Sequence, residues 1–195
     1  MKRNVLLMAV LCILIGFCTG CNRIISEDLS QALNVTDYVN SLDCVVKYDL
    51  CIFPSNVNEE VIKEYYFMKD SGLMDDTVVI YVKCKYESEA YEEEVDRISR
   101  IDYGIFDADD SFMRDDISYS GDIRYTESGF NYPAYITVWL KGTCCSYALI
   151  DNDNQEVVYV YLQYATNIDA KFDKDYYPQT TSDKLSIGNL IGYLP

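Results

Sequence analysis

The chain has 195 residues, a formal net charge of −16 and no histidine. Without histidine it can form neither a Ser-His-Asp nor a Cys-His nucleophilic centre, nor a histidine-ligated metal site. The acidic balance repels phosphate backbones, so no nucleic-acid partner is expected.

The first twenty residues have the organisation of a secretory signal peptide. Lys2 and Arg3 precede an uncharged, mostly apolar run from Asn4 to Phe17. This run is too short to span a bilayer core comfortably. A basic start, a compact apolar region and small residues before a cut are typical of a cleaved signal.

The residues before the predicted cut resemble the lipobox of bacterial lipoprotein precursors. Thr19, Gly20 and Cys21 match its last three positions, and Cys18 occupies the position where Leu is usual. The resemblance covers residues 1–21 alone. It implies cleavage after Gly20, a lipid-modified Cys21, and attachment to the extracytoplasmic side of the cell membrane. The alternatives are an uncleaved anchor helix and, less favoured, a Cys18–Cys21 redox pair.

The rest of the chain predicts one domain. We expect a signal peptide at 1–20, a lipidated N-terminus and tether at 21–41, an α+β domain at 42–165, and a polar tail at 166–195. The tether has room for a short helix. Hydrophobic periodicity then predicts a strand at 42–53, a helix at 58–70, a strand at 77–86 and a helix at 88–101 capped by Ser88.

The second half is rich in predicted strands. A short strand at 122–126 precedes stronger ones at 134–140, 143–150 and 155–164, joined by turn-like residues. The predicted fold class is therefore α+β: an antiparallel meander sheet packed by about two helices, in the order β-α-β-α and then β-β-β-β.

The two turns predict a register for the last three strands. If Val138 faces Cys145 and Leu149 faces Glu156, both turns give the same core face. That face collects Ile136, Val138, Cys145, Tyr147, Leu149, Val158 and Val160.

On the opposite face, small residues of the middle strand lie between aromatic residues of its neighbours. The residues of this predicted aromatic trough are Tyr135, Trp139, Cys144, Ser146, Tyr159 and Tyr161. Such a trough suits a peptide, a glycan or a partner helix. The alternative is that one of the protein's own helices fills it.

Five cysteines follow Cys21: Cys44, Cys51, Cys84, Cys144 and Cys145. Cys84 and Cys145 both lie on faces expected to be buried. They are a possible disulfide, and two packed thiols are the equal alternative. The acidic segments 107–111 and 151–155 lack the glycine and final glutamate of an EF-hand, so neither a metal nor another cofactor is expected.

These patterns favour a membrane-anchored extracytoplasmic lipoprotein that binds an envelope protein, a peptide or a glycan. No catalytic residue can be assigned, and the chain is not expected to be an enzyme. A carboxylate-based glycan hydrolase and a structural or assembly subunit of an envelope complex are the alternatives.

Overall fold

The computed structural model describes residues 23–42, 51–54, 58–71, 76–101, 104–106, 125–126, 130–140, 144–163 and 172–177. Side chains are not described at 104–106, 125–126 and 138–140. Among the described residues, no helix has the length and apolar character needed to cross a membrane. The lipobox and the acidic segment 107–111 lie outside these ranges.

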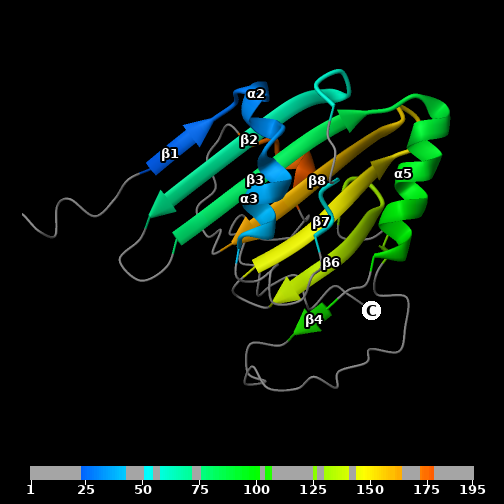
Figure 1. The fold of residues 1–195 in the computed structure, drawn as a ribbon. Coiled ribbons are helices and arrows are strands. Elements are labelled where there is room, and N and C mark those ends of the chain that lie inside the picture. Colours follow the sequence, from blue (N-terminus) through cyan, green and yellow to red (C-terminus); the bar gives the residue numbers. More distant parts are fainter. Residues whose placement is uncertain are drawn as a thin grey trace, which may run out of the picture.

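The described residues form one mostly antiparallel sheet with helices against it (Figure 1). Its strand order is β1-β2-β3-β8-β7-β6-β4, with β5 also paired to β6. The β4–β6 pair is parallel and the other pairs are antiparallel. The predicted α+β class with an antiparallel sheet is confirmed. The strands are β1 (Arg23–Ser26), β2 (Ile62–Ser71), β3 (Asp76–Lys85), β4 (Gly104–Phe106), β5 (Tyr125–Thr126), β6 (Ala134–Leu140), β7 (Cys144–Asp151) and β8 (Glu156–Gln163).

The helical elements are α2 (Leu29–Ala32), α3 (Val35–Asn40), α5 (Ser88–Arg100) and a 3-10 turn, η1 (Lys174–Tyr176). The predicted helix at 88–101 is α5, and Tyr91 and Ile98 are its buried residues. Its N-cap is Glu87 rather than Ser88. The Ser88 hydroxyl instead accepts a hydrogen bond from Gln155 Nε2 at 2.7 Å, which ties the start of α5 to the turn before β8.

The predicted helix at 58–70 is wrong, and the β-α-β-α order fails with it. Most of this segment is strand β2, paired with β1 on one side and β3 on the other. Tyr65 packs into the core on one face of the sheet, and Tyr66 and Met68 into the core on the other. A strand buried on both faces carries a continuous apolar run, which also satisfies helical spacing. A register shift between Ile62 and Glu64 further masks the alternation.

The predicted strand at 42–53 lies mostly outside the described residues. The part that is described, residues 51–54, forms no strand. Ile52 and Phe53 are nevertheless buried against the sheet, and Arg97 Nη2 of α5 donates to the Ile52 carbonyl at 2.8 Å.

Two segments expected to be tether and tail contribute to the core. Residues 23–40 form β1, α2 and α3, in which Ala32, Val35 and Val39 are buried. Near the other end, Phe172, Tyr176 and Tyr177 are buried around η1. These segments contain few apolar residues, but those few are enough to dock the segments because they project to one side and pack against a large sheet.

The sheet separates two cores. The first face is covered by α2, α3, residues 51–54 and α5; the second is covered by residues around Phe130 and by 172–177. The predicted core face of the last three strands is the second face. Its described members Ile136, Cys145, Tyr147, Leu149, Val158 and Val160 are all buried there.

The predicted register is correct at one end of β6 and shifted elsewhere. Ile136 pairs with Tyr147 as expected, but a bulge at Thr137 places Val138 opposite Ser146 rather than Cys145. Between β7 and β8, Leu149 pairs with Val158 rather than Glu156. This second shift is two residues long, so the side chains of β7 and β8 keep their predicted faces. The shift in β6 is one residue long, so the predicted faces of Val138 and Trp139 are wrong: their register positions are exchanged between the two faces.

Candidate functional site

The predicted aromatic trough is not an open surface. Cys144, Ser146, Tyr159 and Tyr161 have no exposed area, and Tyr135 is partly buried against the same core. The Trp139 side chain lies outside the described residues. The shared face was predicted correctly for the five other residues, but the bulge in β6 pairs Trp139 with Cys145 of the second face, so its place in the trough was wrong. The trough is filled by the protein's own covering elements, which is the alternative that the sequence left open.

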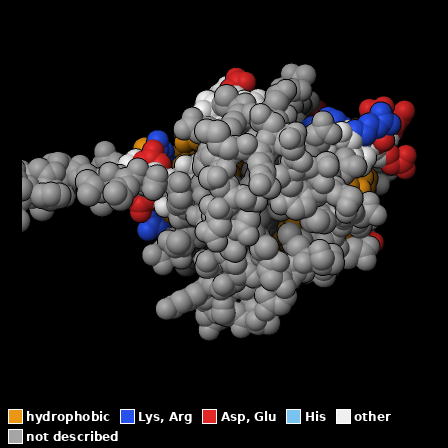
Figure 2. Space-filling model, turned by 90° about the horizontal axis from the view of Figure 1, so that it is seen from below, with side chains coloured by type: hydrophobic (Ala, Val, Ile, Leu, Met, Phe, Trp, Pro, Cys, Tyr) orange, Lys and Arg blue, Asp and Glu red, His pale blue; other side chains and the backbone are white. Residues whose placement is uncertain are grey.

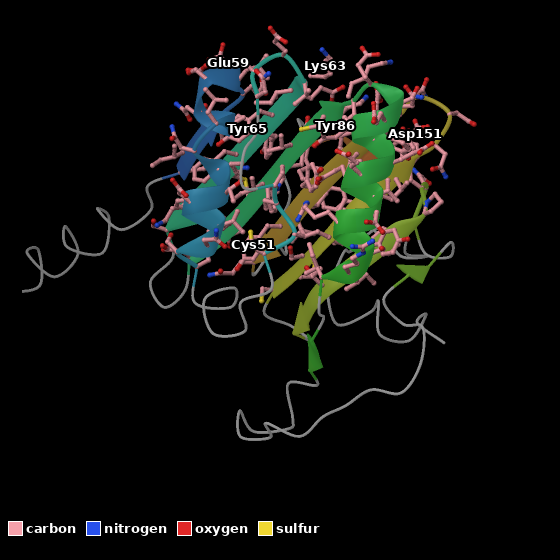
Figure 3. All side chains as sticks on the ribbon, turned by 45° about the vertical axis from the view of Figure 1, so that its right-hand side comes forward. Cys51, Glu59, Lys63, Tyr65, Tyr86 and Asp151 are labelled. Carbon is pink, nitrogen blue, oxygen red and sulfur yellow. The ribbon has the colours of Figure 1, made fainter. Side chains whose placement is uncertain are left out.

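A polar network joins α5 to the floor of the filled trough. The Tyr159 hydroxyl donates to Glu94 Oε1 and lies 2.8 Å from the Tyr86 hydroxyl. Arg97 pairs with the same carboxylate through two nitrogens, Nε at 2.8 Å and Nη2 at 2.6 Å. In Figure 3, Tyr86 lies beside α5.

The ionisation states in this network support packing rather than catalysis. Burial raises the pKa of Tyr159 and of Tyr86, so both phenols stay protonated and can donate. Burial alone would lower the pKa of Arg97, but its bonds to Glu94 raise it above the usual value. A carboxylate held by a permanent cation and a neutral phenol is a satisfied, partly buried ion pair.

The Cys84–Cys145 disulfide is contradicted. Cys84 is buried in the core of the first face and Cys145 in that of the second, and both are thiols. Two side chains that project from opposite faces of one sheet cannot bring their sulfur atoms to bonding distance. Their shared burial was predicted correctly, and only their faces were not distinguished.

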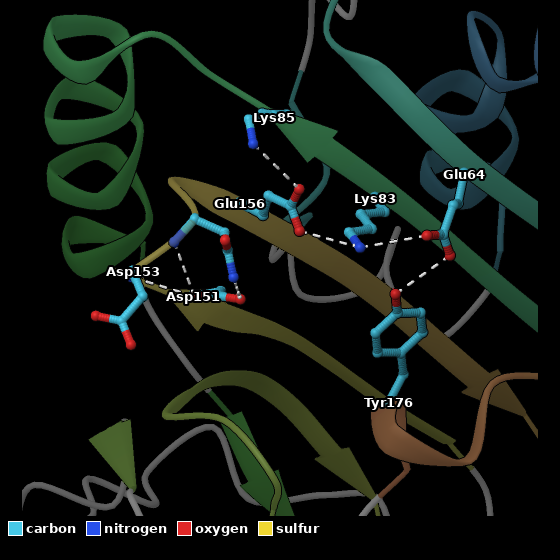
Figure 4. A network of polar contacts seen from close by, with 8 residues as sticks. Glu64, Lys83, Lys85, Asp151, Asp153, Glu156 and Tyr176 are labelled. Atoms are coloured by element: carbon cyan, nitrogen blue, oxygen red, sulfur yellow. Dashed lines mark hydrogen bonds and ion pairs between the residues drawn. The ribbon is translucent and has the colours of Figure 1, made fainter.

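At the rim of the second face, Lys83 lies between two carboxylates (Figure 4). Its Nζ is 3.2 Å from Glu64 Oε1 and 3.0 Å from Glu156 Oε2. The Tyr176 hydroxyl also donates to Glu64 Oε2, at 3.2 Å. The adjoining cavity measures about 10 Å³, which is room for about one water molecule and not for a sugar ring. This cluster therefore offers no glycosidase cleft.

The acidic segment 151–155 is a turn that satisfies itself. Asp151 Oδ1 accepts the backbone N–H groups of Asp153 and Asn154, both at 3.1 Å. Its other oxygen accepts from the Asn154 side chain at 2.8 Å. These bonds account for the acidic and amide residues as turn formers. Within the described ranges, no group of three or more acidic or cysteine side chains is placed to hold a metal ion.

A groove between the N-terminal helices and β2 is the candidate functional site. Its volume is about 250 Å³, just under the range of roughly 300–1,000 Å³ that holds drug-sized ligands. We call it the N-terminal groove, and it is lined by Gln31, Asn34, Val35, Tyr38, Tyr65 and Phe67. Figure 3 places Tyr65 on the sheet beside the helices.

The groove combines an aromatic wall with neutral polar groups. The Tyr38 and Phe67 rings meet edge to face, with centroids 5.3 Å apart. Burial, with the nearby Tyr38 phenol and the Asp28 carboxylate, raises the pKa of Tyr65 to about 12, and burial likewise raises that of Tyr38. Both phenols are neutral at physiological pH, and the Gln31 and Asn34 carboxamides add donors and acceptors without charge.

Sequence reasoning missed this groove because it requires two segments assigned to other structures. Residues 21–41 were expected to form a tether, and 58–70 a helix. One usable signal was present: Ala32, Val35 and Val39 recur at helical spacing and are all buried. Comparison of the chain with protein-family models, curated proteins and solved structures gives no match.

Proposed function

We propose that this protein is a lipoprotein held through Cys21 at the extracytoplasmic side of the cell membrane. The single observation that carries the proposal is Thr19-Gly20-Cys21, which follows a basic start and a short apolar run. Several acyl chains on one cysteine would hold a folded domain at a membrane that a single chain would hold only marginally.

We further propose that the folded domain is a binding module whose ligand site is the N-terminal groove. Aromatic rings supply apolar area with a polar edge, and carboxamides fix the orientation of a ligand. The volume suits one sugar ring or one large side chain. Since the groove lining carries no formal charge, its ligand is a neutral group of an envelope glycan or of an envelope peptide.

Metabolic labelling with a fatty acid tests the anchor. The wild-type protein is expected to be labelled and the Cys21→Ala variant unlabelled. Cys18→Ala is the matched control, because Cys18 would be discarded with the signal and its loss should leave the label intact. Equal labelling of wild type and Cys21→Ala contradicts the proposal.

Titration with soluble wall-glycan fragments and with short peptides tests the groove. A double variant, Gln31→Ala with Asn34→Ala, removes two orienting amides, and loss of one or two hydrogen bonds should weaken binding about tenfold or more. Glu59→Ala, an exposed substitution that is not in the groove lining, is the control and should leave affinity unchanged. A ligand that binds wild type and double variant equally well would exclude this groove as its site.

A further inference from the structure

The exposed apolar side chains of the described residues gather in one short stretch of chain. Large hydrophobic side chains with substantial exposure occur at four described positions: Ile24 at 54%, Leu29 at 45%, and Ile25 and Leu33 at 37% each. We call these four residues the N-terminal apolar surface. All four lie in the ten-residue stretch 24–33, in β1, in α2 and at the C-cap of α2, whereas the other exposed positions that the structure describes are polar, charged or small.

The fold explains why these side chains face solvent. β1 is the edge strand of the sheet, and its two isoleucines project to opposite faces. Both would meet a lipid layer that the sheet contacts with this edge. In α2, Ala32 faces the core, while Leu29 and Leu33 are four residues apart and lie on a common side of the chain. Figure 1 places β1 and α2 at the same edge of the sheet. Figure 2 shows hydrophobic side chains among charged ones at that end.

The surface begins very close to the proposed anchor. Strand β1 starts at Arg23, so Asn22 alone separates it from Cys21. Two residues span at most about 7 Å. A lipidated Cys21 would therefore hold β1 at the headgroup level, with no tether of the expected length between membrane and domain.

We propose that the N-terminal apolar surface rests on the lipid interface in which the acyl chains of Cys21 are embedded. This inference depends on the proposed anchor. Contact with lipid would remove four apolar side chains from water, and burial of apolar surface lowers the free energy. The net charge of −16 does not favour contact with anionic headgroups, so the apolar contact should be strongest on neutral lipid.

The first measurement is hydroxyl-radical footprinting of the lipidated protein in phosphatidylcholine vesicles. Its reference is residues 21–195 with Cys21→Ala in solution, a chain that retains every described element. Labelling of the four side chains is expected to fall several-fold on vesicles, because water no longer reaches them. Labelling of Tyr132, which is partly exposed beside the core of the second face, should stay unchanged. Unchanged labelling of all four residues overturns the inference.

The second measurement is flotation of the unlipidated 21–195 chain with neutral vesicles. Serine at positions 24, 25, 29 and 33 should lower its partitioning about tenfold or more, since partitioning scales with apolar area. The chain with serines should keep the urea midpoint of its parent, which separates lost contact from lost folding. Addition of phosphatidylglycerol should weaken the binding of the parent chain.

The outcomes distinguish this inference from the anchor itself. If the wild type carries no fatty-acid label but the serine variant still binds vesicles less well than its parent, the anchor is rejected and the surface is kept. Fatty-acid label with unchanged footprints keeps the anchor and rejects the surface. If the four side chains become protected without vesicles as protein concentration rises, they are the interface with a second copy, and the lipid contact is rejected.

Discussion

Each face of the sheet carries a buried core, but the two cores are covered by different means. The first face is covered by helices and by residues 51–54, and its polar groups meet in the Glu94–Arg97–Tyr159 network under α5. The second face is covered by aromatic side chains from segments with little regular structure. There the Phe172 ring lies 5.7 Å from that of Tyr66 and 5.1 Å from that of Tyr81.

This difference shows how the sequence encodes the segments that cover each face of the sheet. A helix such as α5 presents a periodic apolar stripe that a sequence pattern can identify. A turn such as η1 presents two or three large rings whose positions depend on the sheet beneath them. The polar contacts differ in the same way: Tyr159 donates to a carboxylate, and Tyr147 on the second face donates to the Tyr176 backbone carbonyl at 2.8 Å.

The largest expected effect is that of Phe172→Ala on the second face. Phe172 is 2% exposed and its ring contacts three tyrosine rings, so its removal should lower the free energy of unfolding by about 3–5 kcal/mol. Urea unfolding measures this loss. Asp153→Ala, on an exposed turn, should change stability by no more than about 0.5 kcal/mol. Equal effects of the two substitutions would show that residues 172–177 do not cover the sheet.

Removal of one tyrosine hydroxyl on each face compares how much the polar contacts of the two faces contribute to the free energy of unfolding. Tyr159→Phe deletes a bond to a charged group and should cost about 1.5–3 kcal/mol. Tyr147→Phe deletes a bond to a neutral carbonyl and should cost about 0.5–1.5 kcal/mol. Both phenols have no exposed area, so solvent does not distinguish them. If Tyr147→Phe proves the more costly, the contrast between an ionic and a neutral network is wrong.

Substitution of two lysines tests whether the ion pairs of Lys83 with Glu64 and Glu156 stabilise the second face. Lys83 is 20% exposed and lies between two carboxylates, so Lys83→Met should cost about 2 kcal/mol, between the values for exposed and buried pairs. Lys69 makes a more exposed pair with Asp76 at 2.7 Å, and Lys69→Met should cost about 0–1 kcal/mol. Thermal or urea unfolding at low and high salt measures both, and the Lys69 effect should be the more sensitive to salt.

The effect that is smallest at neutral pH is the change in pH dependence on loss of one buried thiol, because it appears only above pH 9. Burial raises the pKa of Cys84 from 9.0 to about 12. The folded state thus keeps the proton that the unfolded chain loses above pH 9. The stabilisation is complete below that pH and is lost as pH rises towards 12.

Urea midpoints at pH 8, 9, 10 and 11 measure this dependence. Stability should fall above pH 9, and Cys84→Ala should reduce the slope by at most about 1.4 kcal/mol per pH unit. Cys145→Ala should have a similar effect on the opposite face, because burial raises the pKa of that thiol too. A midpoint that stays constant from pH 8 to 11 would contradict the burial of both thiols.

Much of the fold could be predicted because some elements carry their own periodicity. The stripe of Tyr91 and Ile98 in α5, and the alternation from Val78 to Cys84 in β3, are local signals that tertiary contacts reinforce. The inner faces of β7 and β8 followed from turn residues, since a register error of two residues preserves the face of every side chain. The bulge in β6 is a one-residue error that the turn residues do not reveal.

The candidate site could not be predicted in this way. Tyr65 and Phe67 belong to a strand buried on both faces, whose apolar run also fits a helix. Gln31 lies in α2 and Asn34 caps α3, and both helices are too short to carry a sustained amphipathic pattern. Only the docking of α2 and α3 on β2 brings these four residues to one groove.

The amino-acid sequence by itself determined the strongly acidic charge, the absence of histidine chemistry and the α+β class, and it carries the lipobox-like residues on which the proposed anchoring depends. The tertiary structure decided what covers each face of the sheet, which face each buried cysteine occupies, and that the aromatic trough is filled. The physical reason is that burial is a property of contacts between distant segments. A side chain on a strand has two possible faces, and only the elements packed against them determine whether it is core, site or surface.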